Sequence, residues 1–314
     1  MAGLFFLFLL PFCLGGKEVF CEICHTSIKG RYFLINRKPC CSRNCVEEMR
    51  RRLLPACALC RRSVERFVRR TSVAGEQVFC TSCNALPGCF HCKFPAGGGL
   101  ETLPDSRRIC RECRRGAVKD PRRGEELFRK VRSDLKRLLG IGTGHRITFS
   151  LADSRKIASL NNRSSHREWG LFVCKKAART KIVRSRLTGK VLQKTSLPVQ
   201  KEYFIYILSH LPAGSFAQTA VHELTHDYME EYFPCIKDPV WCEGAAEYAA
   251  SLYNIVRKNS GRNQVMEKND DPVYGEGYRM FRRLIPSSLS PREKAEKLKL
   301  LLARKNREEQ KRRR

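Results

Sequence analysis

The sequence predicts an α+β protein in which a small cysteine-rich part precedes a larger mixed domain. Twelve of the 17 cysteines form six close pairs before residue 114. Beyond residue 121, segments with strand-like alternation lead into segments with the 3.6-residue periodicity of amphipathic helices. The 314 residues are 42% hydrophobic, which excludes a wholly unstructured chain and allows one sizeable domain and a smaller one.

The first 16 residues have the features of a secretory signal. An apolar run from Ala2 to Leu14 is broken by Pro11 and followed by two glycines, and it is too short to span a bilayer. We therefore expect residues 1–16 to be a signal peptide, no transmembrane segment, and a secreted or periplasmic protein. The alternatives are a misassigned start or a buried N-terminal strand, and without a cleaved signal we expect a cytoplasmic protein.

The paired cysteines predict three structural zinc sites. A C-x2-C turn aims two thiolates at one point, and a second pair completes a tetrahedron around zinc. Taken two pairs at a time, the cysteines leave 16, 19 and 17 residues between pairs. The first site predicts a zinc ribbon at 17–54, and the other two occupy 55–118. The predicted ligands are Cys21, Cys24, Cys41 and Cys45; Cys57, Cys60, Cys80 and Cys83; and Cys89, Cys92, Cys110 and Cys113.

Several alternatives remain open for the cysteines. A secreted chain meets an oxidising compartment, where the same pairs would form a disulfide framework. Cys40 is adjacent to Cys41 and is the alternative ligand of the first site, and His25 and His91 lie beside ligand cysteines. The remaining residues, Cys13, Cys174, Cys235 and Cys242, read as free thiols.

The segment Lys119–Pro121 marks the boundary of the larger domain, which we expect to span 119–286. Apolar residues recur at helical spacing from Pro121 until Gly140 ends the pattern. Short strands are expected at 147–151, 170–174 and 202–208, and a hairpin at 180–185 and 190–195 with its turn at 187–189.

The next predicted helix carries the sequence His222-Glu-Leu-Thr-His226. The two histidines are four residues apart, so both imidazoles project from one helix face and can share one zinc ion. Glu223 lies beside that ion and is the candidate general base. A separate stripe would bury the helix against the core: Ala217, Val221, Leu224 and Tyr228.

A catalytic zinc needs a third protein ligand, for which Glu243 is the candidate. It opens a second helix that Asp238 and Pro239 would start, after the first helix ends near Phe233. Glu247 lies one turn further on the same face and is either an alternative ligand or a carboxylate that orients a ligand histidine. Plain helix-surface charge is the simpler explanation of both glutamates.

The helix pair resembles zinc metallopeptidases of the gluzincin type, in which H-E-x-x-H is followed by a glutamate on a second helix. Cys242-Glu-Gly and Tyr274-Gly-Glu-Gly-Tyr-Arg resemble the LIM-domain-associated, ubiquitin-activated plant organ-size-regulator peptidases. The resemblance implies a LIM-like module at 55–118 and a zincin-type peptidase domain with one catalytic zinc. It also isolates Tyr274 as the candidate oxyanion donor, with Tyr248 and Tyr278 as rivals. A LIM module usually has a histidine where this chain has Cys80.

The chain carries 61 basic and 31 acidic residues, a formal net charge of +30. Basic clusters occur at 50–52, at 107–114 and in the tail at 287–314, which reads as a charged helix or a loose segment. Such clusters suit an acidic partner, nucleic acid or an anionic membrane surface. We expect a zinc endopeptidase whose cysteine-rich array binds a substrate or partner. The alternative is a zinc-ribbon adaptor, possibly for nucleic acid, in which the H-E-x-x-H site is not catalytic.

Overall fold

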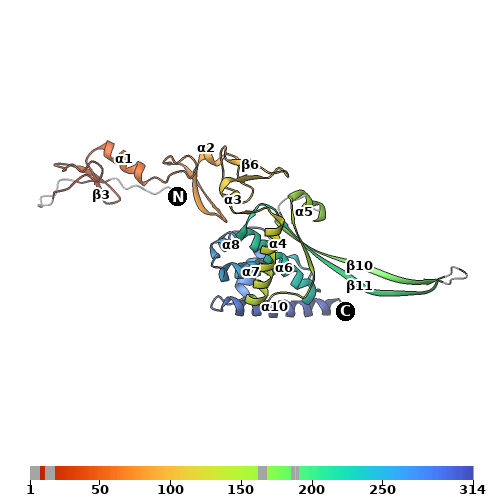
Figure 1. Ribbon diagram of the computed structural model, residues 1–314. Coiled ribbons are helices and arrows are strands. Elements are labelled where there is room, and N and C mark those ends of the chain that lie inside the picture. Colours follow the sequence, from red (N-terminus) through yellow and green to blue (C-terminus); the bar gives the residue numbers. More distant parts are fainter. Residues whose placement is uncertain (1–7, 11–17, 162–167, 185–187, 189–190, 314) are drawn as a thin grey trace. The chain divides into compact units, whose positions relative to one another are not determined.

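The computed structural model describes residues 8–10, 18–161, 168–184, 188 and 191–313 (Figure 1). It is a mixed helix and strand protein, as the sequence predicts, and it divides into two compact units. The amino-terminal unit comprises Met1–Thr71, Gly75–Gly88 and Lys93–Gly98. The carboxy-terminal unit comprises Ser72–Ala74, Cys89–Cys92 and Gly99–Arg314. The third cysteine quartet therefore groups with the larger unit.

The amino-terminal unit is built from short elements. Strands β1 (Phe8–Leu10), β2 (Tyr32–Ile35) and β3 (Lys38–Cys40) form an antiparallel sheet, and α1 (Arg43–Leu53) follows it. Strands β4 (Phe67–Ser72) and β5 (Gly75–Cys80) pair with each other before the short helix α2 (Thr81–Asn84). Apart from β1, the predicted signal segment 1–16 lies outside the described residues.

The carboxy-terminal unit begins with small elements around the third quartet. Strands β6 (Leu100–Thr102) and β7 (Arg108–Cys110) pair, and α3 (Arg111–Arg115) follows. Strand β8 (Ala117–Val118) then pairs with β12 (Leu211–Pro212), directly before the helix that carries the two histidines.

Helix α4 (Pro121–Leu139) has the limits that its sequence predicts. The Asp120 side chain accepts a hydrogen bond from the Arg123 backbone, Pro121 occupies the first turn, and Gly140 ends the helix in the left-handed conformation with φ 65°. Its buried face includes Phe128, Val131 and Leu135.

The main sheet has the strand order β10-β11-β9, with β11 parallel to β9 (Ile147–Ala152) and antiparallel to β10. The sequence predicts four short strands where the structure has two long ones, β10 (Gly170–Arg184) and β11 (Val191–Leu208). The predicted turn at 187–189 lies outside the described residues except for Thr188. The short helix α5 (Ser154–Asn161) follows β9 and precedes β10 in the chain.

Helix α6 (Ala213–Tyr232) packs against this sheet, α4 and α7 (Pro239–Val256). Of its predicted apolar stripe, Val221 and Leu224 are buried, whereas Ala217 and Tyr228 are partly buried. Phe216 and Ala220 complete the buried face. The 3-10 turn η1 (Ser260–Arg262), α8 (Asn263–Glu267), α9 (Tyr274–Leu284) and α10 (Pro291–Arg312) complete the unit. The tail is thus helical over most of its length. In the part of the chain that the structure describes, no helix has the length and apolar content to cross a bilayer.

Candidate metal centre and cysteine sites

Two helices bring three metal-ligating side chains together in the carboxy-terminal unit. His222 and His226 project from α6, and their Nε2 atoms are 3.1 Å apart. Glu243 projects from α7, and its Oε2 lies 3.0 Å from His222 Nε2 and 3.2 Å from His226 Nε2. These three ligand atoms lie within 4.8 Å of one another, so one ion can bind all three. Burial works against ionising Glu243, but hydrogen bonding with both histidines outweighs it and holds its pKa well below the usual range.

Glu247 is placed to orient a histidine rather than to bind the same ion. Its Oε1 lies 3.1 Å from Nδ1 of His222, on the side of the ring away from Glu243. A histidine whose Nδ1 donates to a carboxylate presents Nε2 with a free lone pair, which is the tautomer that metal binding requires. The orienting role predicted for Glu247 therefore agrees with this geometry.

Glu223 is buried beside the ligands. The pKa of its carboxyl is raised because the effect of burial is the largest. The neighbouring charges of His222 and His226 and a backbone hydrogen bond from Phe172 act in the opposite direction. Glycine at position 170, the first residue of β10, makes room for this carboxylate. A Cβ atom there would be 2.5 Å from Glu223 Oε1 and 2.6 Å from Thr219 Cγ2.

A cavity of about 330 Å³ opens over these residues. The three ligands, Glu223 and Tyr274 line it together with the start of β10 and with Pro234, Ile236 and Lys237. The Tyr274 ring is 6.0 Å from the His222 ring at 20°, and burial raises the pKa of its phenol. The rival tyrosines Tyr248 and Tyr278 do not line this cavity; both are buried in the core, with their rings 6.4 Å apart.

Two glycines explain why the motif residues at 242–244 and 274–279 lie together. Gly244 on α7 and Gly277 on α9 meet backbone to backbone, and a Cβ on Gly244 would be 2.6 Å from the Gly277 Cα. Side chains at this crossing would separate the helices. The close approach places Tyr274, at the start of α9, next to the ligands on α6 and α7.

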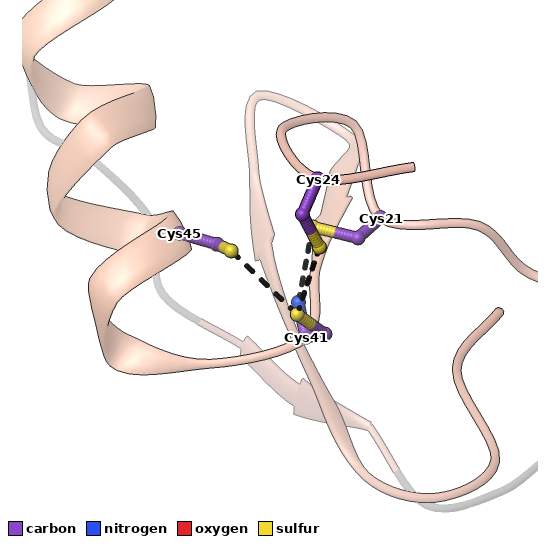
Figure 2. Close-up of side chains that lie close together, drawn as sticks. All are labelled: Cys21, Cys24, Cys41 and Cys45. Atoms are coloured by element: carbon purple, nitrogen blue, oxygen red, sulfur yellow. Dashed lines mark hydrogen bonds between the residues drawn. The ribbon is translucent and has the colours of Figure 1, made fainter. Parts of the chain in front are cut away.

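The twelve predicted cysteine ligands form three groups, each with its four sulfurs within 4.8 Å of one another. A tetrahedral zinc site with bonds of about 2.3 Å separates its sulfurs by about 3.8 Å. In the first group the Cys41 sulfur is 3.4 Å from that of Cys24 and 3.6 Å from that of Cys45, which lies on α1 (Figure 2). In the third group the sulfurs of Cys92 and Cys110 are 3.9 Å apart. These spacings suit zinc.

The structure distinguishes between the alternative ligands of the first cysteine site. Cys41, not Cys40, joins the first group, whereas Cys40 is fully buried with Ile35, Val46 and Met49. None of the described cysteines forms a disulfide. Cys174, Cys235 and Cys242 belong to none of the four groups, and Cys13 lies outside the described residues.

The third quartet is joined to the histidine helix by a contact that the sequence does not reveal. His91 lies with Nδ1 3.3 Å from the Cys113 sulfur and Nε2 2.5 Å from the hydroxyl of Ser215, in the first turn of α6. Its ring also stacks on Trp169 at 5.3 Å, next to Gly170.

Arg262 of η1 also contacts the Ser215 hydroxyl, and it donates a hydrogen bond to Gln218 Oε1 at 3.1 Å. The start of α6 is thus fixed by the cysteine site on one side and by η1 on another.

A second polar contact fixes the other end of the histidine motif. Asp227 follows His226 directly and is 1% exposed. It accepts a hydrogen bond from the Thr143 hydroxyl at 2.5 Å, and its other oxygen is 2.7 Å from Nδ1 of His145. The His145 ring stacks on Tyr203 of β11 at 3.7 Å. Sequence reasoning missed this contact because His145 lies 82 positions from Asp227 and shares no motif with it.

No known family model, no curated protein and no solved structure matches this chain.

Proposed function

We propose that the chain is a zinc-dependent peptidase with a zincin-type catalytic domain and three structural zinc sites. The observation that carries the proposal is the convergence of His222, His226 and Glu243 on one point beside the buried carboxylate of Glu223, in an open cavity. Two imidazoles and one carboxylate are the ligand set of a catalytic zinc, whereas structural zinc sites are closed by four protein ligands.

The residues of the cavity divide the chemistry between them. Zinc, when bound, supplies a Lewis acid and lowers the pKa of a water ligand toward ~7. Glu223 is the general base that accepts the proton of the attacking water and later delivers it to the leaving amine, and the raised pKa of a buried carboxyl suits both steps. Tyr274, protonated at neutral pH, donates a hydrogen bond to the oxyanion that develops on the carbonyl.

A peptide is the substrate class that the cavity favours. Strand β10 is at the edge of the main sheet, and Gly170, Leu171 and Phe172 line the cavity. An edge strand offers unpaired backbone groups to a chain in extended conformation. The cysteine-rich amino-terminal unit would bind the substrate protein or another partner.

Replacing Glu223 with Gln tests the proposal. The amide keeps the size of the side chain but cannot accept the proton, so we expect cleavage of unfolded casein to fall by about 10²- to 10⁴-fold while the zinc content is unchanged. Glu126→Gln makes the same chemical change on an exposed face of α4 and should leave activity intact. Equal activity of wild type and Glu223→Gln would refute the peptidase. A zinc-loaded wild type that cleaves neither casein nor any other protein tested would favour the adaptor.

A further inference from the structure

Helix α9 begins beside the cavity and carries the proposed oxyanion donor in its first turn. Tyr274 is the first residue of the helix, and the side chain of Val273, directly before it, forms no capping hydrogen bond. The first backbone N–H groups of a helix have no partner within the helix, and an end without other partners frays. The position of the Tyr274 phenol therefore depends on what holds this end of α9.

Asp271, in the loop before α9, supplies the missing partners. Its Oδ1 accepts hydrogen bonds from the backbone N–H groups of Val273 and Tyr274, both at 2.9 Å. Its backbone carbonyl accepts from the N–H groups of Gly275 at 3.0 Å and Glu276 at 3.1 Å, as the carbonyl of a capping residue does. Asp271 is thus the residue that caps the start of α9.

The loop that carries this cap is itself fixed to α9. Asn269 Oδ1 accepts a hydrogen bond from the backbone N–H of Asp271 at 3.1 Å. The Asn269 carbonyl accepts one from Arg279 Nη1, on α9, at 2.6 Å. Gly275 allows this carbonyl to approach, because a Cβ atom at position 275 would overlap the Asn269 oxygen. The Asp271 carboxylate is therefore held in place from two sides.

The Tyr274 hydroxyl has no comparable attachment of its own. In the part of the chain that the structure describes, no group forms a hydrogen bond with this hydroxyl. The ring lies 6.0 Å from the His222 ring and lines the cavity. The hydroxyl is therefore placed by the backbone of the first turn and by the packing of the ring, and it remains available to a substrate.

An aspartate that only stabilises its helix is the simpler explanation of this cap. Asp120 and Asp238 cap α4 and α7 in the same way, and each is followed by a proline, as Asp271 is. The cap of α9 differs in what it holds, because one of the two N–H groups that it binds belongs to Tyr274 itself. Movement of this turn would displace the phenol from the metal centre.

We propose that Asp271 is a positioning residue of the metal centre, which holds the Tyr274 hydroxyl where the oxyanion develops by capping α9. The inference rests on the proposed peptidase and on the donor role of Tyr274. An oxyanion donor is effective when it is already in position before the reaction, and a displacement of about 1 Å can lower the rate by about 10²-fold. Asp271 does not line the cavity, so its loss should lower kcat and leave KM nearly unchanged.

The test measures kcat and KM for cleavage of fluorescein-labelled casein by the full zinc-loaded chain. D271A removes the capping carboxylate, so kcat should fall by about 10- to 100-fold while KM changes less than about twofold. Y274F removes the donor and should lower kcat by about 10²- to 10³-fold. The double variant should match Y274F within about twofold, because the cap then has no donor to position.

Two matched variants separate positioning from stability. D271N keeps an acceptor at the cap and should restore kcat to within about threefold of the wild-type value. D120A removes the corresponding cap of α4, so it should lower the melting temperature about as much as D271A does and leave kcat unchanged. Zinc content should be the same in all variants, since the ligands come from α6 and α7.

A further measurement does not require activity. Backbone hydrogen exchange, followed by mass spectrometry, should become faster at residues 273–276 in D271A and stay at the wild-type rate in D271N. Unchanged exchange in D271A would show that Asp271 does not hold this turn, and the proposal would be wrong.

The kinetic outcomes distinguish failure of this inference from failure of the proposed function. Wild-type kcat in D271A, or an equal loss of kcat in D120A, would overturn the positioning role. A double variant that falls below Y274F by the factor seen for D271A alone would show that Asp271 acts independently of Tyr274. Full activity of Y274F would refute the donor and leave the peptidase intact. A wild type that cleaves no casein would instead refute the peptidase, and the role of Asp271 with it.

Discussion

At Gly170 the metal centre has no room for a methyl group. The nearest atoms to a Cβ there belong to Glu223 and Thr219 on α6, and backbone neighbours on β10 cannot move without disturbing the sheet. Gly170 therefore acts on the proposed chemistry through the position of the Glu223 carboxylate.

We expect Gly170→Ala to lower peptidase activity by about 10²-fold, because a displacement of about 1 Å at a catalytic group has effects of this size. Zinc content should stay at the wild-type value, since the ligands come from α6 and α7. The measurement is casein cleavage beside metal analysis. Gly99→Ala, at a position with nothing within 4 Å, is the control, and full activity in Gly170→Ala would contradict the role given to this glycine.

At the scale of elements, the crossing of α7 and α9 makes a second prediction. A Cβ on Gly277 would be 2.7 Å from the Gly244 Cα, so alanine there forces the helices apart. We expect Gly277→Ala to lower the free energy of unfolding by about 1–3 kcal/mol, as overpacking does. Urea denaturation measures this, with Gly261→Ala, in open space, as the comparison. An equal effect of the two variants would mean that the contact is not tight.

The contact of His91 with Ser215 makes the third cysteine site matter to α6. Cys110→Ser should cost one zinc ion and also reduce peptidase activity at least about tenfold, because the helix that carries both histidines loses support at its start. Cys80→Ser makes the same change at the matching position of the second site and should cost one zinc ion without this loss of activity. Both variants are compared by zinc analysis and casein cleavage. Equal activities would show that the third site is independent of α6.

The elements differ in how well their own sequences predict them. Asp120 and Gly140 cap the two ends of α4, and Asp238 caps the start of α7. A few neighbouring residues are therefore enough to predict these helix limits. The strands before α6 are harder, because β10 and β11 run through residues whose polar and apolar alternation is interrupted, and their pairing depends on a partner strand. The same limit applies to the site. Spacing on one helix predicts that His222 and His226 share a face, whereas the His91 contact joins residues 124 positions apart.

The whole molecule combines two kinds of group that could hold a metal ion, the cysteine quartets and the histidine–glutamate centre. The amino-terminal unit has two cysteine quartets and few large buried side chains, so we expect metal binding to supply much of its folding free energy. The carboxy-terminal unit has an extended apolar core around α4, α6 and α7 that exists apart from its metal centre.

We therefore expect about four zinc ions per chain, one of which a mild chelator removes. Removal of all zinc by a strong chelator, without denaturant, should make the described part of the amino-terminal unit sensitive to trypsin while the core around α6 stays resistant, because that core has extensive apolar packing of its own. Limited proteolysis with mass spectrometry distinguishes the two regions. Loss of both at once would show that the larger unit also folds only with metal.

The polar contact of Asp227 with Thr143 and His145 has a consequence for which ions the centre accepts. This contact opposes rotation of α6 about its own axis. The two imidazoles and the carboxylate of the metal centre are therefore held in position before an ion binds. The conformational entropy of these ligand side chains is lost when the protein folds, so little more is lost when the ion binds. We therefore expect cobalt or manganese to bind at the same three side chains as zinc, and the visible absorption of bound cobalt would report on the geometry of the site.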